Sequence, residues 1–306
     1  MKRFSKYILG LASLLVLANA TTTAQAAETH SFKDSAGRTV KIPNDLEKIV
    51  VDTYPDEALA LGQNVVGTSQ WDAGNPYISK AQKKVLKDLG APMNAEKIAA
   101  HKPDLIVTIQ KDEVSKYEKI APTVYVEYNS IKGLDETLDY FAKVYDAQDA
   151  KKTFLKKFDQ EADKQIAKLE KADITPSDAT ISLIELSGDK IYAYGNNWAR
   201  GGQALTRGLG FKQSKGMQAL SDGDGWKEIN AESLADFDAD YIFVDFAEAD
   251  KAQYEKLQEN PIWQTLKAVK ANQVVTMDYA DVYYYGGPIA SKALMGKYTQ
   301  AILDLN

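Results

Sequence analysis

The chain contains no cysteine and only two histidines, His30 and His101. Without cysteine it can form no disulfide, no thiolate metal site and no cysteine nucleophile. His30 stands near the amino terminus, and His101 lies in the segment AAHKPDLI, where a packing or turn role is expected. A site for bare zinc or manganese uses several histidines together with carboxylates. The composition therefore argues against binding of bare zinc or manganese as the main function.

Long apolar runs are also missing. The longest run, Ile8–Leu17, is too short to span a membrane as a helix. Positive charges stand before it and a small-residue A-x-A site, Ala24–Ala26, follows it, which together form a signal peptide at residues 1–26. The charged residues are Lys2, Arg3 and Lys6. The mature chain is expected to begin near Ala27 and to act outside the cytoplasm.

Positive charge is scarce in the remainder. The net charge is −6, and loss of the three basic residues of the signal peptide takes it to −9. Such a chain lacks the basic stripe that nucleic-acid binding requires. The strings G-x-G-x-x-G, G-x-x-x-x-G-K-[ST] and G-x-S-x-G are absent, so nucleotide binding and serine hydrolysis lack their defining residues. Asp222 and Asp224 are the local acid pair for a hydrolase, and a surface turn explains them better.

One long amphipathic helix is predicted over residues 149–172. Its apolar side chains recur at steps of three and four, with charged and amide side chains between them. Lys171 and Pro176 supply the stop. The apolar positions are Phe154, Leu155, Phe158, Ala162, Ile166 and Leu169. At 1.5 Å per residue this helix is long enough to cross a whole domain.

The same pattern stands on both sides of that helix. Asn94–Thr108 and Asn230–Val244 each read as an Asn N-cap, an acid in the first turn, a short helix, an aspartate and an apolar β-run. Apolar β-runs alternate with helical patterns elsewhere in both halves, which is typical of an α/β fold with a mainly parallel sheet. We therefore predict two Rossmann-like α/β lobes, residues 27–148 and 173–306, bridged by the single long helix. Small ligands bind in clefts between such lobes.

Aromatic residues gather in two segments that carry the candidate binding site. The segment IYAYGNNWARGG, residues 191–202, places tyrosines at strand spacing before a glycine-rich loop, and DYADVYYYGGP, residues 278–288, holds three consecutive tyrosines. Ligands of α/β lobes are met by loops at strand ends, and clustered Tyr, Trp and Arg favour a binding surface. The candidates are Tyr192, Tyr194, Trp198, Arg200, Tyr283, Tyr284 and Tyr285, with Tyr54 and Tyr128 from the first lobe.

With these features, the chain resembles the bacterial ABC-transporter substrate-binding proteins whose two lobes are joined by one rigid helix (class III). The segments Asp34–Pro43, KPDLI and Asn260–Val275 are in the style of that family. Within it, YAYGNNWARGG is similar to the ligand loop of the ferric-hydroxamate-siderophore-binding lipoproteins of Gram-positive bacteria. The resemblance implies that Tyr192, Trp198 and Arg200 contact the siderophore, and that Tyr283 and its neighbours close the opposite side.

The residue types fit a ferric hydroxamate. Such a complex is neutral, so one arginine and several aromatic faces suffice to bind it. Catecholate or carboxylate siderophores call for several cations, and after the signal peptide the chain holds only Arg38, Arg200 and Arg207. Those chelates and haem stay as alternatives, and an extracellular hydrolase is a weaker one. The siderophore holds the iron, so the protein is expected to supply no metal ligand and to need no cofactor.

The resemblance also implies a partner. Glu96 and Glu232 occupy equivalent places in the two copies of the repeat, and related proteins dock one acid per lobe onto the permease subunits of an ABC importer with its ATPase. The protein is expected to be a monomer in a periplasm or at the outer cell surface. Gram-positive relatives are anchored through a lipidated cysteine, which the segment LVLANATTTAQA lacks.

Overall fold

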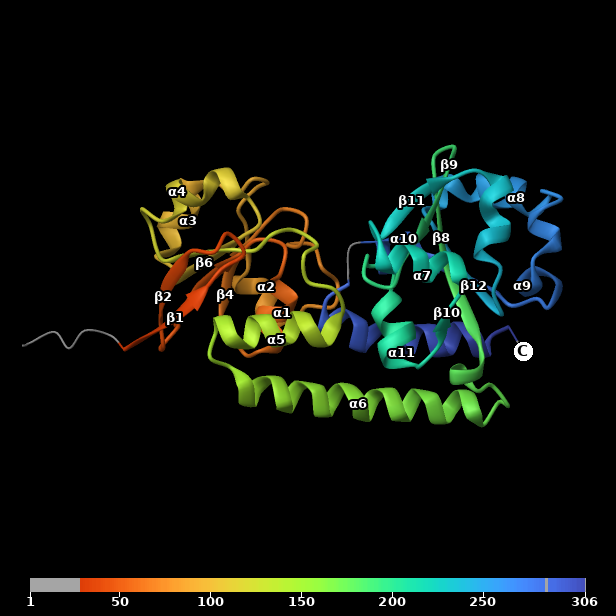
Figure 1. Cartoon of the computed structure of the whole chain (residues 1–306), viewed down its shortest axis with the longest axis horizontal. Helices are drawn as coiled ribbons and strands as arrows, with labels where there is room; N and C mark the ends of the chain where they lie inside the picture. Colours follow the sequence, from red (N-terminus) through yellow and green to blue (C-terminus); the bar gives the residue numbers. More distant parts are fainter. Residues whose placement is uncertain (1–27, 284–285, 306) are drawn as a thin grey trace, which may run out of the picture.

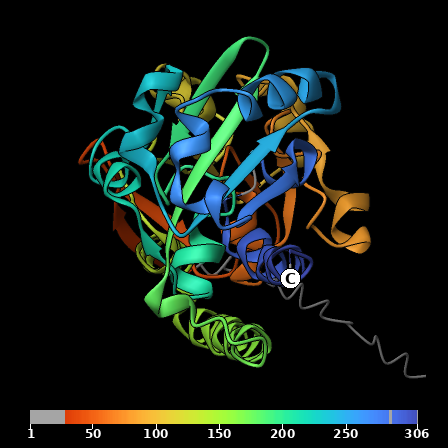
Figure 2. The same ribbon diagram turned by 90° about the vertical axis from the view of Figure 1, so that its right-hand side faces the viewer.

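The computed structural model describes residues 28–283 and 286–305. It contains two α/β lobes, with the long helix α6 lying beneath both (Figure 1). An end-on view shows the strands stacked above the same helix (Figure 2). The predicted fold class is therefore confirmed. The predicted signal peptide, as well as Tyr284 and Tyr285, falls outside the described residues.

The N-terminal lobe is built on a parallel sheet. Its five strands lie in the order β5-β4-β3-β6-β7, and every pair is parallel. A separate antiparallel hairpin, β1 and β2, precedes this sheet. The central strands read IVV and LIVT and are buried throughout, as expected for a sheet covered on both faces. The strands are β1 Thr29–Lys33, β2 Thr39–Pro43, β3 Ile49–Val51, β4 Val65–Thr68, β5 Lys87–Asp88, β6 Leu105–Thr108 and β7 Thr123–Tyr125; the helices are α1 Pro55–Ala60, α2 Lys80–Val85, α3 Ala95–His101, η1 Lys111–Glu113, α4 Val114–Tyr117 and α5 Leu134–Val144.

The C-terminal lobe has a mixed sheet in the order β11-β9-β8-β12-β13, with β10 paired to the start of β8. Strands β8, β10, β12 and β13 are parallel to one another, whereas β9 pairs antiparallel with β8 on one side and with β11 on the other. Only two residues, Gly188 and Asp189, separate β8 from β9, which permits a hairpin and no crossover. The strands are β8 Thr180–Ser187, β9 Lys190–Tyr194, β10 Lys212–Gln213, β11 Trp226–Ile229, β12 Tyr241–Phe246 and β13 Val274–Asp278; the helices are η2 Pro176–Asp178, η3 Ala204–Gly208, α7 Lys215–Asp222, η4 Ala231–Phe237, η5 Glu248–Asp250, α8 Lys251–Gln258, η6 Trp263–Thr265, α9 Lys267–Lys270, α10 Tyr279–Val282 and α11 Pro288–Leu303.

Helix α6 spans Gln148–Glu170, 23 residues or roughly 34 Å, close to the predicted range. Phe158, Ala162 and Leu169, which the apolar pattern selected, are buried on one face. The opposite face is solvated, as its charged side chains require.

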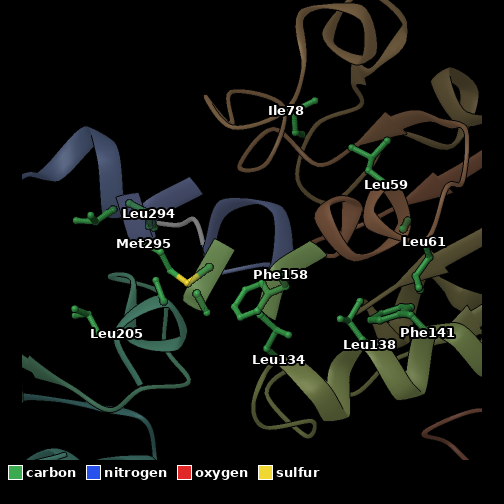
Figure 3. Packing of buried hydrophobic residues seen from close by; sticks show 14 of the residues in the cluster. Leu59, Leu61, Ile78, Leu134, Leu138, Phe141, Phe158, Leu205, Leu294 and Met295 are labelled. Carbon is green, nitrogen blue, oxygen red and sulfur yellow. The ribbon is translucent and has the colours of Figure 1, made fainter. Parts of the chain in front are cut away.

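Helix α11 is the second element that joins the lobes. It packs on α6 and on η3, and its N-terminal end contacts α1 of the first lobe. One continuous cluster of buried apolar side chains runs through both lobes, with Phe158 of α6 between α5 and α11 (Figure 3). Leu138 and Phe141 lie on one side of it and Leu294 and Met295 on the other (Figure 3). Apolar packing therefore joins the two lobes through α6 and α11.

Polar contacts also cross between the lobes. The Lys132 ammonium donates to the Gly223 carbonyl at 2.8 Å, and the Leu134 amide donates to the Gln203 side chain at 3.1 Å. The second contact joins the first residue of α5 to the loop that follows β9, and the first joins the segment before α5 to the C-terminal end of α7.

Candidate functional site

A cleft of about 550 Å³ lies between the lobes. Every predicted ligand residue that the structure describes lines it, from β9 and its loop, from α10 and its end, and from two loops of the first lobe. They are Tyr54, Tyr128, Tyr192, Tyr194, Trp198, Arg200 and Tyr283. Tyr284 and Tyr285 lie outside the described residues, so their placement stays a prediction.

The loop after β9 owes its shape to three consecutive left-handed residues. Ala199, Arg200 and Gly201 have φ of 53°, 50° and 69°. For the two non-glycine residues this conformation costs on the order of 1–3 kcal/mol each. Tyr298 of α11 holds the loop by donating its hydroxyl to the Arg200 carbonyl at 2.6 Å. The strain therefore serves to turn the Arg200 side chain back toward the sheet.

Arg200 is buried, with 4% of its surface exposed, and forms an ion pair with Glu185 of β8. Its Nε donates to Glu185 Oε2 at 2.8 Å, and its Nη2 donates to the same oxygen and to the Tyr194 hydroxyl, the latter at 3.1 Å. Its Nη1 donates to the Tyr283 carbonyl. These four hydrogen bonds use four of the five N–H groups of a guanidinium. Among the described residues, one Nη1–H is left for a ligand.

Two tyrosine rings cover the guanidinium. Its central carbon lies 4.2 Å from the ring centroid of Tyr194 and 4.5 Å from that of Tyr283. Burial acts to lower the pKa of Arg200, and the neighbouring Tyr194, Glu185 and Asp245 outweigh it, so the pKa is raised. The arginine is therefore charged at any physiological pH, and a cation over aromatic faces is stabilised further.

Asp245 of β12 is a second buried acid behind the arginine. Burial raises its pKa to about 8, against the opposing effect of Arg200. Its Oδ2 has no hydrogen-bond partner among the described residues. Because Arg200 is already paired with Glu185, the cluster has no uncompensated positive charge.

Aromatic rings form a chain across the mouth of the cleft. Tyr128 of the first lobe meets Trp198 edge to face, with ring centroids 5.8 Å apart. Trp198 in turn lies 6.4 Å from Trp226, which lies 5.8 Å from Tyr192. Tyr128 is 52% exposed and Trp226 41% exposed, so apolar surface is available for an aliphatic ligand arm.

Tyr279 and Tyr283 close the other side of the cleft. Their rings stack with centroids 4.1 Å apart and planes at 29°. The Tyr283 ring therefore lies between the Arg200 guanidinium and the Tyr279 ring. Tyr283 thus lies beside Arg200, and its closing of the opposite side of a bound ligand stays a prediction.

The first-lobe wall carries carboxylates. Asp56 of α1 accepts hydrogen bonds from the Ile289 and Ala290 amides at the start of α11, at 3.2 and 3.1 Å. Asp72 accepts one from the Ser69 hydroxyl at 2.9 Å. Burial raises the pKa of Asp56 and of Asp72 to about 7 each. Asp56 thus ties the two lobes together beside the cleft.

Sequence reasoning missed several lining residues. It found the arginine but not its buried partner Glu185, and it did not select Glu57, Asp72 or Trp226. Glu185 had a visible signal, since it interrupts the apolar strand TISLIELS at a position between buried neighbours. An acid within a buried strand calls for a cation nearby. The acids of the first lobe had no such signal.

The two predicted docking acids lie at matching positions. Asn94 caps α3 and Asn230 caps η4, each accepting a hydrogen bond from the third amide after it. Glu96 and Glu232 are therefore the second residue of their helices, and both are exposed. The predicted N-caps are confirmed, while the docking role stays a prediction.

His30 makes structural hydrogen bonds with its ring nitrogens. The His30 ring bonds Asn44 at 3.0 Å and the Val144 carbonyl at 3.1 Å. Within residues 28–283 and 286–305, no group of three or more acidic or histidine side chains is arranged to hold a metal ion. In the same part of the chain, no helix combines the length and the apolar character that crossing a bilayer demands.

Comparisons with known proteins identify the family to which the chain belongs. The model of the periplasmic binding protein family matches residues 52–280. The iron(3+)-hydroxamate-binding proteins YxeB and FhuD of Bacillus subtilis are 34% and 33% identical, over 89% and 91% of this chain and 84% and 88% of their own. The solved structure of FhuD2 from Staphylococcus aureus with bound ferrioxamine B is similar with a TM-score of 0.69 at 27% identity, covering 84% of this chain and 99% of that one. The chain belongs to the periplasmic binding protein family.

Proposed function

We propose that this chain captures a ferric hydroxamate siderophore in the cleft and delivers it to the permease of an ABC importer. The observation that carries the proposal is the cleft itself, where one arginine with a single remaining donor stands among tyrosine and tryptophan rings. Two relatives are named as iron(3+)-hydroxamate-binding proteins, and a structural neighbour holds ferrioxamine B. The sequence-derived resemblance points to the same ligand class.

The charge of the cleft supports a ligand without strong negative charge. A ferric trihydroxamate is neutral, because three monoanionic groups balance Fe³⁺. Arg200 is the basic residue among the described lining residues, and Glu185 already compensates its charge. An anionic catecholate or citrate complex would be placed against Asp56, Glu57 and Asp72 with no compensating cations. A neutral complex avoids that repulsion.

The geometry supports a role for each lining residue. The free Nη1–H of Arg200 donates to a hydroxamate oxygen, and Trp198, Trp226, Tyr128 and Tyr192 cover the aliphatic arms. The mature chain acts outside the cytoplasm as a monomer, and no protein atom coordinates the iron. Tyr54 and Tyr194 support the wall on either side.

A titration tests this proposal. The purified mature chain is mixed with ferrioxamine B, ferrichrome, ferric enterobactin, ferric citrate and haem while tryptophan fluorescence is followed. Because Trp198 and Trp226 line the cleft, a bound ferric complex quenches them. Saturable quenching by the two hydroxamates supports the proposal. Binding of haem or of the catecholate alone would overturn it.

Docking is tested separately. Glu96 and Glu232 lie exposed on equivalent helices, one in each lobe, so they offer a paired charge to a two-subunit permease. The double variant Glu96→Ala and Glu232→Ala is expected to bind ferrioxamine B as the parent does and to lose siderophore-dependent iron uptake in cells. Glu255→Ala, an exposed acid on α8, serves as the control. Normal uptake with the double variant would remove the docking role.

A further inference from the structure

The wall of the cleft carries more acid than the binding of a neutral complex uses. Four acids and one arginine are found among its described lining residues: Asp56, Glu57, Asp72, Glu185 and Arg200. Glu185 pairs with Arg200, and Asp56 is occupied by two amides of α11. The remaining two acids, Glu57 and Asp72, both belong to the first lobe.

Glu57 is the acid that the fold leaves without a partner. It is 7% exposed and lines the cleft, yet in the described part of the chain its carboxylate forms no ion pair and accepts no hydrogen bond from another residue. The charges that act on it come from Asp56 and Asp72, which are of the same sign. A buried carboxylate among acids is unfavourable unless a cation approaches it. The open side of this site is the cleft.

We propose that Glu57, with Asp72 beside it, forms a subsite for a protonated amine carried by the siderophore. The chain then selects ferric hydroxamates that bear an ammonium group over neutral complexes built on the same scaffold. This inference rests on the proposed function and adds the charge of the ligand to it. Arg200 holds the iron-bound end from the second lobe, and Glu57 holds the cationic end from the first.

A proton linkage accompanies this binding. Burial and the neighbouring acids raise the pKa of Glu57 well above its ordinary value, and burial raises that of Asp72 to about 7. Tyr54 and Tyr145 also face Glu57, and burial raises the pKa of each, so both are neutral. An ammonium group favours the ionised acid and releases its proton. Affinity for a cationic ligand therefore rises with pH, including the range near 7 in which Asp72 titrates, whereas a neutral ligand lacks this dependence.

The experiment uses two ligands that differ only in the amine. Ferrioxamine B carries a primary ammonium, and its N-acetylated form has the same iron centre without the charge. Dissociation constants of the mature chain for both are measured by tryptophan quenching at pH 6, 7 and 8. We expect the amine form to bind at least about tenfold more tightly at pH 8 and the preference to shrink at pH 6.

Variants locate the effect. Glu57→Gln should bring the ratio of the two dissociation constants close to one, and Asp72→Asn should reduce it. Glu255→Gln, an exposed acid on α8 away from the cleft, should leave it unchanged. Circular dichroism and thermal unfolding check that each variant is folded.

The outcomes separate the two proposals. Equal affinity of the parent chain for both ligands at all three pH values would overturn the cation subsite and leave siderophore binding intact. Failure of the chain to bind either ligand would overturn the proposed function itself. The comparison with the parent chain needs no variant, so a misfolded Glu57→Gln would not leave the subsite undecided.

Discussion

Replacing Arg200 with alanine should destabilise the fold by more than the loss of one side chain suggests. The change leaves Glu185 buried, with 4% of its side chain exposed, and without its counter-ion. Glu185 Oε2 loses two N–H donors of the guanidinium and keeps the Tyr194 hydroxyl at 2.9 Å. Breaking a buried pair from one side costs about 3–5 kcal/mol. The free energy of unfolding of a typical domain is about 5–15 kcal/mol, so the variant should lose a large part of its stability.

Urea unfolding followed by circular dichroism measures this cost, and two further variants isolate its cause. Arg207→Ala removes an arginine that also pairs with two acids, Asp135 and Asp159, but at 31% side-chain exposure. Exposed pairs contribute about 0–1 kcal/mol, so this variant should lose little. The double variant Arg200→Met and Glu185→Leu removes both buried charges and should recover most of the stability.

Two results would refute this reasoning. If Arg200→Ala costs no more than Arg207→Ala, the buried pair is not a stability element. If the double variant is no more stable than Arg200→Ala, the cost does not come from the uncompensated charge of Glu185.

Three further predictions follow from the site. Trp198→Ala should weaken binding of ferrioxamine B about 10- to 100-fold, since a buried aromatic face is worth about 1.5–3 kcal/mol, while Trp71→Ala, outside the cleft lining, should change the dissociation constant little. Gly201→Ala should lower the thermal midpoint of unfolding strongly, because φ is +69° and an added Cβ would lie 2.1 Å from the ring of Tyr298. Gly62→Ala is the control: φ is +80° but no atom lies within 4 Å of the added Cβ, so this variant measures only the backbone cost of about 1 kcal/mol. Asp245, whose folded pKa of about 8 lies above its ordinary 3.8, contributes stability that is fully present below pH 3.8 and lost as the pH rises to 8; the unfolding free energy of Asp245→Asn should therefore decline less across this range, by at most about 1.4 kcal/mol per pH unit. An unchanged dissociation constant, equal midpoints for the two glycine variants, or identical pH profiles would each contradict the corresponding argument.

Local patterns were sufficient where one element decides the outcome. The apolar steps predicted α6 within two residues at either end, because a helix that buries one face must repeat at 3.6 residues. Asn94 and Asn230 were recognised as N-caps because capping depends on a residue and the amides directly after it. The twofold occurrence of that pattern was enough to predict two lobes. The two aromatic segments predicted the rings that line the cleft for a similar reason, because each segment lies at the end of a strand.

The rest depended on contacts between segments far apart in the chain. The sequence placed Arg200 on a loop. Only the fold shows that three left-handed residues turn its side chain inward onto Glu185, which belongs to a strand that begins 20 residues earlier in the chain. The antiparallel placement of β9 between β8 and β11 likewise depends on the length of a hairpin and on pairing across the sheet. Charge balance in the cleft was beyond sequence reasoning, because Glu57 and Asp72 become neighbours of the aromatic loop only when the lobes pack through α6 and α11. Residue type and spacing determined which groups were available, and tertiary packing determined which of them are paired and which is left for a ligand.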